Sequence, residues 1–203
     1  MTDTQTPRLR LALFDLDHTL LPLDSDHEFG EFLIRQGLAD AVQYRQTNDG
    51  FYQQYCEGTL VLDDYIRFTT SIWREMSPAE QMKLQQAFMD EVIYPAMQPQ
   101  AVELVERHRA QGDLLAIVTA TNEFVTRPIA DAFNVADLLA VRLVRDEQGR
   151  VTGDIDGVPS FREGKITRVE QWLADKGHQL SDFGRVSFYS DSPNDLPLLE
   201  RAN

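Results

Sequence analysis

The spacing of apolar residues divides the chain into three parts, of which the first is short. Residues 9–13 are apolar apart from Arg10, which predicts a buried strand. The second part has helical spacing throughout, with no strand-like alternation. Its predicted helices lie at residues 25–36, 39–54, 63–75 and 78–93. Ser77-Pro78 opens the last of them with a capping residue and a proline in the first helical position.

In the third part, predicted strands alternate with predicted helices. The strands lie at residues 114–119, 138–144, 151–155 and 186–189, and a turn at residues 146–150 indicates a hairpin. The helices lie at residues 100–111 and 123–133, around residues 166–173, and at 193–201. This alternation predicts a parallel sheet with helices on both faces. We therefore predict an α/β fold in which a core of residues 1–21 and 99–203 carries a helical cap of residues 22–98.

The charge of the chain argues against one class of partner. Its 203 residues carry a formal net charge of −14, which does not suit a protein that follows nucleic-acid phosphates with a broad basic surface. No apolar run approaches the roughly 18 residues that span a bilayer, and the first residues lack a signal-peptide pattern. Cys56 is the only cysteine, so we expect no disulfide framework. These features predict a cytoplasmic protein with neither a nucleic-acid nor a membrane partner.

Polar side chains gather where the predicted strands end, which is where α/β folds bind ligands. They are Asp15, Asp17 and Thr19 after the first strand, Thr119 after the second, Lys165 after the hairpin, and Asp191, Asn194 and Asp195 after the last strand. Carboxylates, hydroxyls and a lysine at one edge suit phosphoryl transfer, which needs positioning, a metal ion and positive charge around the phosphoryl oxygens. A divalent cation held by carboxylates also reconciles an acidic chain with an anionic substrate.

Each of these residues has a predicted role. Asp15 attacks phosphorus and forms an aspartyl-phosphate, while Asp17 serves as general acid and then as base. Thr119 and Lys165 contact the phosphoryl oxygens. The predicted Mg²⁺ site comprises Asp15, Asp17 through its main-chain carbonyl, Asp191 and Asp195, and Asp195 with Asn194 orients metal waters and Lys165. The predicted substrate contacts are Thr19, Asp24, Thr119, Ala120, Lys165 and Asn194.

Four segments resemble the motifs of the haloacid dehalogenase superfamily and follow the order of that family. They are Asp15-Leu16-Asp17-His18-Thr19, Thr119 after a hydrophobic strand, Lys165, and Asp191-Ser192-Pro193-Asn194-Asp195. A helical cap between the first two motifs is similar to the subfamily that contains phosphoserine phosphatase and a histidinol-phosphatase-like branch. The resemblance spans nearly the whole chain. It implies a Rossmann-like core with a C1-type helical cap, Mg²⁺ and an aspartyl-phosphate intermediate.

The chain departs from the family pattern in two places. The last motif usually has glycines where Ser190 and Ser192 stand here, and we expect small geometric adjustments rather than loss of activity. The family normally continues through at least one further strand, whereas this chain stops at Asn203, within or just after a helix. This difference leaves open whether the chain is a shortened one.

Several residues have a structural reading beside the functional one. Thr119 is also suited to capping the helix that follows it. Asp24 lies where phosphoserine phosphatases place an acidic residue for the substrate amine, but it is equally suited to capping the first cap helix. The family's substrate-binding arginine has two candidates, Arg45 and Arg67. Finally, we expect Cys56 to be buried, and we expect the cap interior to contain Trp73, Met76, Phe88 and Met89.

The hypothesis that follows is a Mg²⁺-dependent phosphomonoester phosphatase for a small phosphorylated metabolite, such as phosphoserine or histidinol phosphate. A phosphotransferase is the alternative enzyme, with an acceptor hydroxyl in place of water. A non-catalytic phosphate-binding module is the alternative from another class, and only Ser190 and Ser192 favour it. Dehalogenation is a weaker alternative. The sequence does not indicate the natural substrate or the oligomeric state.

Overall fold

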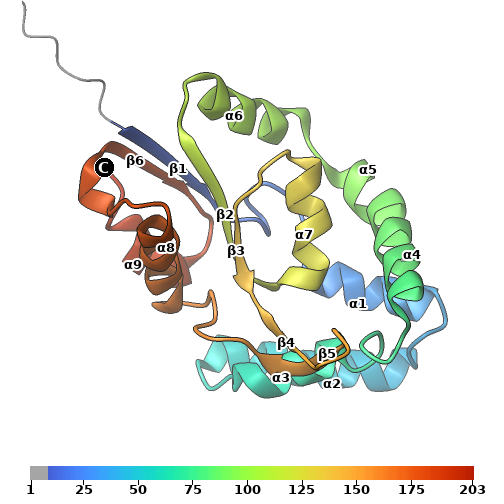
Figure 1. The fold of residues 1–203 in the computed structure, drawn as a ribbon. Helices are drawn as coiled ribbons and strands as arrows, with labels where there is room; N and C mark the ends of the chain where they lie inside the picture. The colour runs from blue at the N-terminus through green and yellow to red at the C-terminus, as the bar shows by residue number, and fades with distance from the viewer. Residues whose placement is uncertain (1–8) are drawn as a thin grey trace, which may run out of the picture.

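The computed structural model describes residues 9–203, and its centre is a four-stranded parallel sheet (Figure 1). Its strands, in spatial order, are β3 (Leu138–Val141), β2 (Leu114–Asn122), β1 (Leu9–Phe14) and β6 (Phe183–Tyr189). Neighbouring strands all pair in parallel. The carboxyl ends of β1, β2 and β6 therefore meet at one edge, as the sequence predicts.

Helices cover both faces of the sheet, which confirms the predicted fold class. Figure 1 shows α6 (Pro99–Ala110) and α7 (Glu123–Ala132) on one side and α8 (Gly164–Asp175) and α9 (Leu196–Leu199) on the other. β1 separates two apolar clusters, because successive side chains of a strand point to opposite faces. Ala12 and Phe14 join the cluster that contains α7, whereas Leu11 and Leu13 join the cluster that contains α8.

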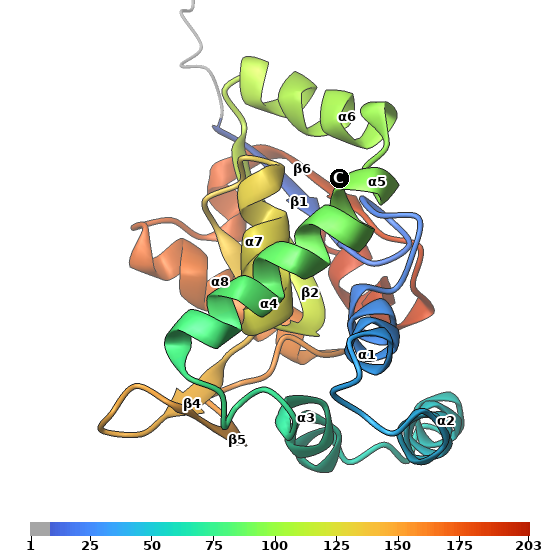
Figure 2. The same cartoon turned by 90° about the vertical axis from the view of Figure 1, so that its right-hand side faces the viewer.

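Residues 22–98, which we call the cap, lie between β1 and β2 and are helical. They form α1 (Ser25–Arg35), α2 (Ala41–Glu57), α3 (Leu62–Thr70), α4 (Pro78–Phe88), the π-helix η1 (Met89–Ile93) and α5 (Tyr94–Ala96). Ser77 and Glu80 form a reciprocal capping box at the N-terminus of α4, where the sequence predicts a cap. Figure 2 shows α4 lying across α7, while α1, α2 and α3 lie at one end of the molecule.

The apolar interior is continuous between the cap and the sheet. Trp73 is fully buried and stacks on Phe124, the second residue of α7, with a ring-centroid separation of 3.7 Å. Phe29 of α1 contacts both Phe88 and Phe124 edge-on. Trp73 is thus buried against the core, whereas Phe88 packs on Phe29 and Phe32 within the cap, as predicted. The division into two domains stays a prediction, since a single cluster joins both parts.

The predicted strand at residues 138–144 is wrong in one respect. The chain leaves the parallel sheet after Val141 and forms a separate antiparallel hairpin of β4 (Leu143–Arg145) and β5 (Val151–Ile155), which confirms the predicted turn between them. The hairpin lies beside α3 of the cap (Figure 1), where Arg67 forms an ion pair of 2.9 Å with Asp154. This part of the predicted core thus packs on the cap and is separate from the parallel sheet.

Three predicted helices are interrupted or shortened in the structure. The helix predicted at 63–75 stops at Thr70, where the hydroxyls of Thr70 and Ser71 donate to main-chain carbonyls and compete with the helical pattern. The helix predicted at 78–93 changes to a π-helix at Met89, shortly before Pro95, which has no N–H to donate. The helix predicted at 193–201 begins with a 3-10 turn, Pro193–Asp195 (η3).

The expected burial of Cys56 is wrong, because its side chain is exposed. α2 is solvated over most of its circumference, and Tyr44 is the only one of its residues that is buried. Cys56 therefore lies on a solvent-facing side of the helix. Within residues 9–203, no helix combines the length and apolar character that crossing a membrane requires.

Candidate active site

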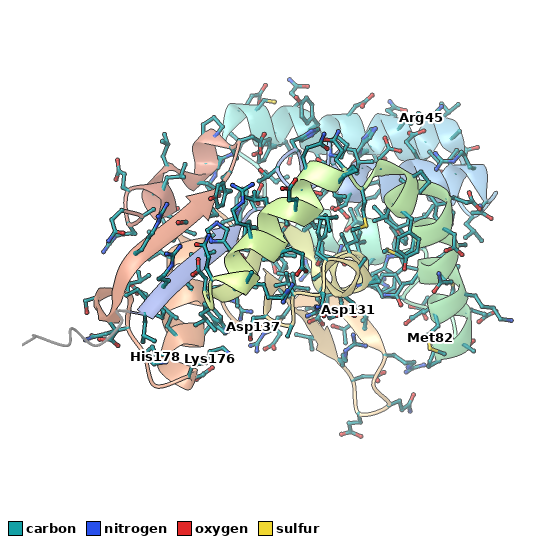
Figure 3. The ribbon with its side chains drawn as sticks, turned by 90° about the horizontal axis from the view of Figure 1, so that it is seen from above. Arg45, Met82, Asp131, Asp137, Lys176 and His178 are labelled. Carbon is teal, nitrogen blue, oxygen red and sulfur yellow. The ribbon has the colours of Figure 1, made fainter. Side chains whose placement is uncertain are left out.

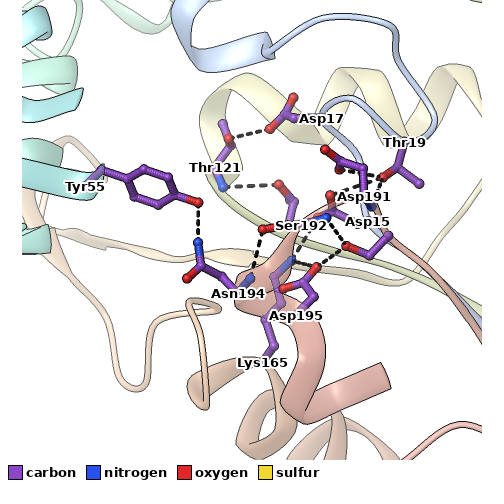
Figure 4. Close-up of polar contacts among 12 residues, drawn as sticks. Asp15, Asp17, Thr19, Tyr55, Thr121, Lys165, Asp191, Ser192, Asn194 and Asp195 are labelled. Atoms are coloured by element: carbon purple, nitrogen blue, oxygen red, sulfur yellow. Dashed lines mark hydrogen bonds and ion pairs between the residues drawn. The ribbon is translucent and has the colours of Figure 1, made fainter. Parts of the chain in front are cut away.

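Lys165 bridges two carboxylates that come from distant parts of the chain. Its Nζ lies 2.8 Å from Oδ1 of Asp15, which follows β1, and 2.7 Å from Oδ2 of Asp195, which follows β6 (Figure 4). Only 4% of the Lys165 side chain is exposed. Because β1 and β6 are adjacent and parallel, their carboxyl ends place both acids within reach of the first turn of α8.

Burial and ion pairing have opposite effects on the pKa values of Asp15 and Lys165. Burial raises the pKa of Asp15 to about 6, although Lys165 acts in the opposite direction. For Lys165 itself, burial alone lowers the pKa, but the two neighbouring carboxylates outweigh it and hold the pKa above the ordinary value. The lysine is therefore a fixed positive charge next to the Asp15 carboxylate.

Asp17 is held between the core and the start of the cap. Its Oδ1 accepts a hydrogen bond of 2.8 Å from the main-chain N–H of Ser25, and its Oδ2 accepts one of 2.8 Å from the hydroxyl of Thr121. Burial, reinforced by the nearby charge of Asp24, raises the pKa of Asp17 to about 8. A carboxyl group with this pKa is protonated at neutral pH, as a general acid must be.

Thr19 joins the carboxylates of the first and last motifs. Its hydroxyl lies 3.4 Å from Oδ2 of Asp15 and 3.1 Å from Oδ1 of Asp191. The described residues contain no group of three or more His, Cys, Asp or Glu side chains arranged to hold a metal ion. Two carboxylates supplemented by a main-chain carbonyl nevertheless fit Mg²⁺, which takes oxygen ligands and retains several waters.

The two serines that replace the family's glycines both form hydrogen bonds. The hydroxyl of Ser190 donates to Asp195 over 2.7 Å and accepts from the main-chain N–H of Ser192, while the Ser192 hydroxyl accepts from the N–H of Asn194. Ser190 thereby fixes the carboxylate that also binds Lys165. The side-chain amide of Asn194 donates to the hydroxyl of Tyr55, so the last motif contacts cap helix α2 (Figure 4).

Most of the predicted site residues line a cavity of about 840 Å³ between the sheet edge and the cap. Asp15, Asp17, Thr119, Lys165 and Asp191 lie on its core side, together with Ala120, Asn194 and Asp195. Thr19 is the one predicted site residue that does not line the cavity, since it contacts Asp15 and Asp191 from behind. The structure thus brings the predicted residues of all four motifs together.

The structure shows which of Thr119 and Asp24 caps a helix. Thr119 does not cap the following helix, because β2 continues to Asn122, and the side chain of Asn122 caps α7 instead. The Thr119 hydroxyl accepts from the N–H of Thr121. Asp24 does cap α1, accepting from the N–H groups of Asp26 and His27, and it also lines the cavity.

Neither candidate arginine lies at the cavity. Arg45 pairs with Glu31 over 2.6 Å, and Figure 3 shows it on the outer side of the cap. Arg67 pairs with Asp154 of the hairpin. The arginine that does line the cavity is Arg162, whose guanidinium lies 4.9 Å from the ring centroid of Phe161. The two named candidates are therefore wrong.

Three residues that form hydrogen bonds with predicted site residues were not predicted from the sequence: Thr121, Ser190 and Tyr55. Thr121 had a usable signal, since it stands two positions after Thr119 in an extended segment and so points to the same side. Ser190 precedes Asp191 directly and was noted only as a departure from the family pattern. Tyr55 had no signal, because its contact depends on how the cap lies over the core.

Known proteins resemble the chain over almost all of its length. It matches the family of haloacid dehalogenase-like hydrolases over residues 12–200. It is 41% identical to a histidinol-phosphatase from Neisseria meningitidis serogroup C (strain 8013), over 93% of this chain and 85% of that protein. It is 26% identical to a probable phosphatase from Mycobacterium tuberculosis (strain ATCC 25618 / H37Rv), over 96% of this chain and 67% of that protein.

Solved structures agree with this assignment. A protein of unknown function from Bordetella pertussis Tohama I is 50% identical, with a TM-score of 0.90 over 96% of this chain and 87% of that one. A substrate-bound phosphoserine phosphatase is 18% identical, with a TM-score of 0.65 over 97% of this chain and 84% of that one, a likeness that concerns the fold alone. The chain belongs to the haloacid dehalogenase-like hydrolases. Within that family it is a phosphatase.

Proposed function

We propose that the protein is a Mg²⁺-dependent phosphomonoester phosphatase that works through an aspartyl-phosphate at Asp15. The observation that carries this proposal is the position of Lys165, whose Nζ contacts both Asp15 and Asp195 in a buried site. A buried lysine beside the nucleophile supplies a fixed positive charge where an anionic phosphoryl group must approach a carboxylate.

The carboxyl groups of Asp15 and Asp17 have different roles in this reaction. An Asp15 oxygen forms a bond to phosphorus while the bond between phosphorus and the ester oxygen breaks. Protonated Asp17 gives its proton to the departing alkoxide, and the alcohol leaves. Ionised Asp17 then takes a proton from water as that water attacks phosphorus, which releases phosphate and restores both carboxyl groups. The raised pKa of Asp17 supports the first half of this role.

The residues that would hold Mg²⁺ are the carboxylates of Asp15 and Asp191 and the main-chain carbonyl of Asp17. The Thr19 hydroxyl supports this arrangement, because it contacts both carboxylates and keeps them close together. When bound, the ion neutralises the repulsion between a carboxylate and a phosphate ester. Asp195 has both Lys165 and Ser190 on the same carboxylate oxygen, so we propose that it acts mainly by holding Lys165 in place.

The cavity favours a basic alcohol over an amino acid as the organic part of the substrate. Asp24, Asp26, Glu28 and Asp49 line it on the cap side, whereas Arg162 is the one arginine among its described lining residues. A substrate carboxylate would meet mostly like charges there. Together with the 41% identical relative named a histidinol-phosphatase, this supports histidinol phosphate as the substrate in preference to phosphoserine.

Steady-state kinetics with three esters test the proposal. With Mg²⁺, we expect hydrolysis of a generic aryl phosphate, and a kcat/KM for histidinol phosphate at least about 10-fold above that for phosphoserine, a difference of about 1.4 kcal/mol. EDTA should abolish turnover, and added Mg²⁺ should restore it. Chelator-resistant hydrolysis would contradict the metal site, and a preference for phosphoserine would contradict the substrate assignment alone.

A further inference from the structure

Asp26 is a buried carboxylate in the wall of the active-site cavity, and the proposed chemistry does not use it. It lies in the first turn of α1, only 7% of the residue is exposed, and it lines the same cavity as Asp15 and Lys165. An acid that only favoured the helix N-terminus would be stable in full contact with water. Burial at a cavity wall therefore calls for another explanation.

The contacts of Asp26 are neutral groups. Its Oδ2 accepts a hydrogen bond of 2.7 Å from the hydroxyl of Tyr65 in α3, and its Oδ1 lies 3.4 Å from the side-chain amide of Asn122 in β2. Within residues 9–203, it forms no ion pair with lysine or arginine. Burial raises the pKa of Asp26 to about 7, and the charge of Asp24 acts in the same direction, whereas Tyr65 and His27 act against it. A cation that reaches this carboxyl group favours its charged form.

Several aromatic rings line the same cavity, and that of Tyr65 lies beside Asp26. The ring of Phe51 meets that of Tyr65 edge-on, with centroids 5.5 Å apart, and both residues line the cavity. Tyr52 and Tyr55 of α2 and Phe161 also line it. Aromatic faces attract cations and accommodate flat rings, and the carboxyl group of Asp26 adds a hydrogen-bond acceptor that a bound cation keeps ionised.

We propose that Asp26, oriented by Tyr65, is a specificity subsite that binds a cationic nitrogen, an ammonium or an imidazolium, in the alcohol part of the substrate. The inference rests on the proposed phosphatase function, because it assigns a second contact to the same substrate. Asp24 also lines this cavity, but it already has a role as the N-cap of α1, where its Oδ1 accepts from two main-chain N–H groups. Asp26 touches the substrate but takes no part in breaking the ester bond.

The test compares a cationic ester with a neutral ester of similar shape. Histidinol phosphate serves as the cationic probe and phenylethyl phosphate as the neutral probe. Asp26→Asn keeps the shape of the side chain and its ability to accept from Tyr65, but it removes the charge. We expect the KM for histidinol phosphate to rise about 10- to 100-fold, the effect of losing a hydrogen bond to a charged group. The kcat for histidinol phosphate and both constants for phenylethyl phosphate should change less than about 3-fold.

Asp63→Asn is the matched control, because it removes one negative charge from the first turn of another cap helix, at an exposed residue that does not line the cavity. We expect less than about 3-fold change with either ester. Tyr65→Phe removes only the hydroxyl that orients Asp26 and should raise the KM for histidinol phosphate alone, by about 3- to 10-fold, in line with the loss of one hydrogen bond. If Asp26→Asn does not fold, as judged by its thermal unfolding, Tyr65→Phe tests the proposed subsite in its place.

Each failure has its own signature. If the unchanged protein hydrolyses neither ester with Mg²⁺, the proposed phosphatase function fails, and the subsite fails with it. If the protein hydrolyses both esters and Asp26→Asn slows them equally, Asp26 has only a structural role and the subsite is overturned. The same conclusion follows if Asp63→Asn raises the KM for histidinol phosphate as much as Asp26→Asn, since a general field effect would then explain both.

Discussion

The hydroxyl of Thr121 donates a hydrogen bond of 2.8 Å to Oδ2 of Asp17, 104 positions earlier in the chain. This bond fixes the proposed general acid from the side of the core, while the N–H of Ser25 fixes its other oxygen from the start of α1. Both contacts hold the carboxyl group at the point where β2, β1 and the cap meet. The orientation of Asp17 therefore depends on the core and the cap together.

Thr121→Val should lower activity without unfolding the protein. The change keeps the side-chain shape but leaves one Asp17 oxygen without its partner, which costs about 1–3 kcal/mol. We expect kcat for an alkyl phosphate to fall about 10- to 100-fold, measured at saturating substrate. Thr126→Val is the control, because Thr126 is also buried and its hydroxyl donates to a helix carbonyl instead. Equal rates for Thr121→Val and the unchanged protein would show that the Asp17 contact is dispensable.

The protonation of Asp17 should limit activity at high pH. Burial raises the pKa of Asp17 to about 8, so the acid form that donates the proton is lost as the pH rises above that value. We expect kcat/KM for an alkyl phosphate to fall about tenfold per pH unit on this limb. In Asp17→Asn the limb should be absent, and the loss of rate should be smaller with an aryl phosphate, whose leaving group needs less protonation. If kcat/KM still falls at high pH in Asp17→Asn, the proton that controls this fall belongs to another group.

Gly164 allows the close approach that brings Lys165 to Asp15. A Cβ atom on Gly164 would overlap the main-chain carbonyl of Pro159, so the start of α8 would have to move. We expect Gly164→Ala to destabilise the protein by about 1–3 kcal/mol and to lower kcat at least about 10-fold. The measurements are chemical denaturation and turnover of an aryl phosphate.

Gly50→Ala provides the control for that change. Gly50 lies within α2, and an added Cβ there would meet nothing within 4 Å. Alanine should stabilise this helix by about 0.5–1 kcal/mol and leave turnover unchanged. If Gly164→Ala behaved in the same way, the tight packing before Lys165 would have no importance for catalysis.

The sequence was sufficient for the parts of the site that stand at strand ends. Asp15, Thr119 and Asp191 follow apolar runs that are buried strands, and parallel strands bring their carboxyl ends to one edge. Lys165 follows the hairpin rather than a strand, and both its position there and the family resemblance indicated its place in the site. Where β2 ends was not predictable from its apolar run alone, because Thr121 and Asn122 are polar and yet still belong to the strand.

Side-chain contacts of the cap helices, with the core or with one another, were not predictable. The pairing of Tyr55 with Asn194 and of Tyr65 with Asp26 depends on how the helices pack, and helical periodicity gives only the buried face. The same limit explains the error at Cys56. An apolar residue in a helix suggests burial, but α2 offers almost no face to the interior.

Replacement of Asp15 by asparagine tests the central claim most directly. Asparagine occupies the same volume but cannot form the aspartyl-phosphate. With Mg²⁺ and a generic aryl phosphate, we expect kcat/KM to fall by about 10³-fold or more, equivalent to at least roughly 4 kcal/mol of barrier, while the far-ultraviolet circular dichroism stays unchanged. Retention of most of the activity by folded Asp15→Asn would contradict the assignment of Asp15 as the nucleophile.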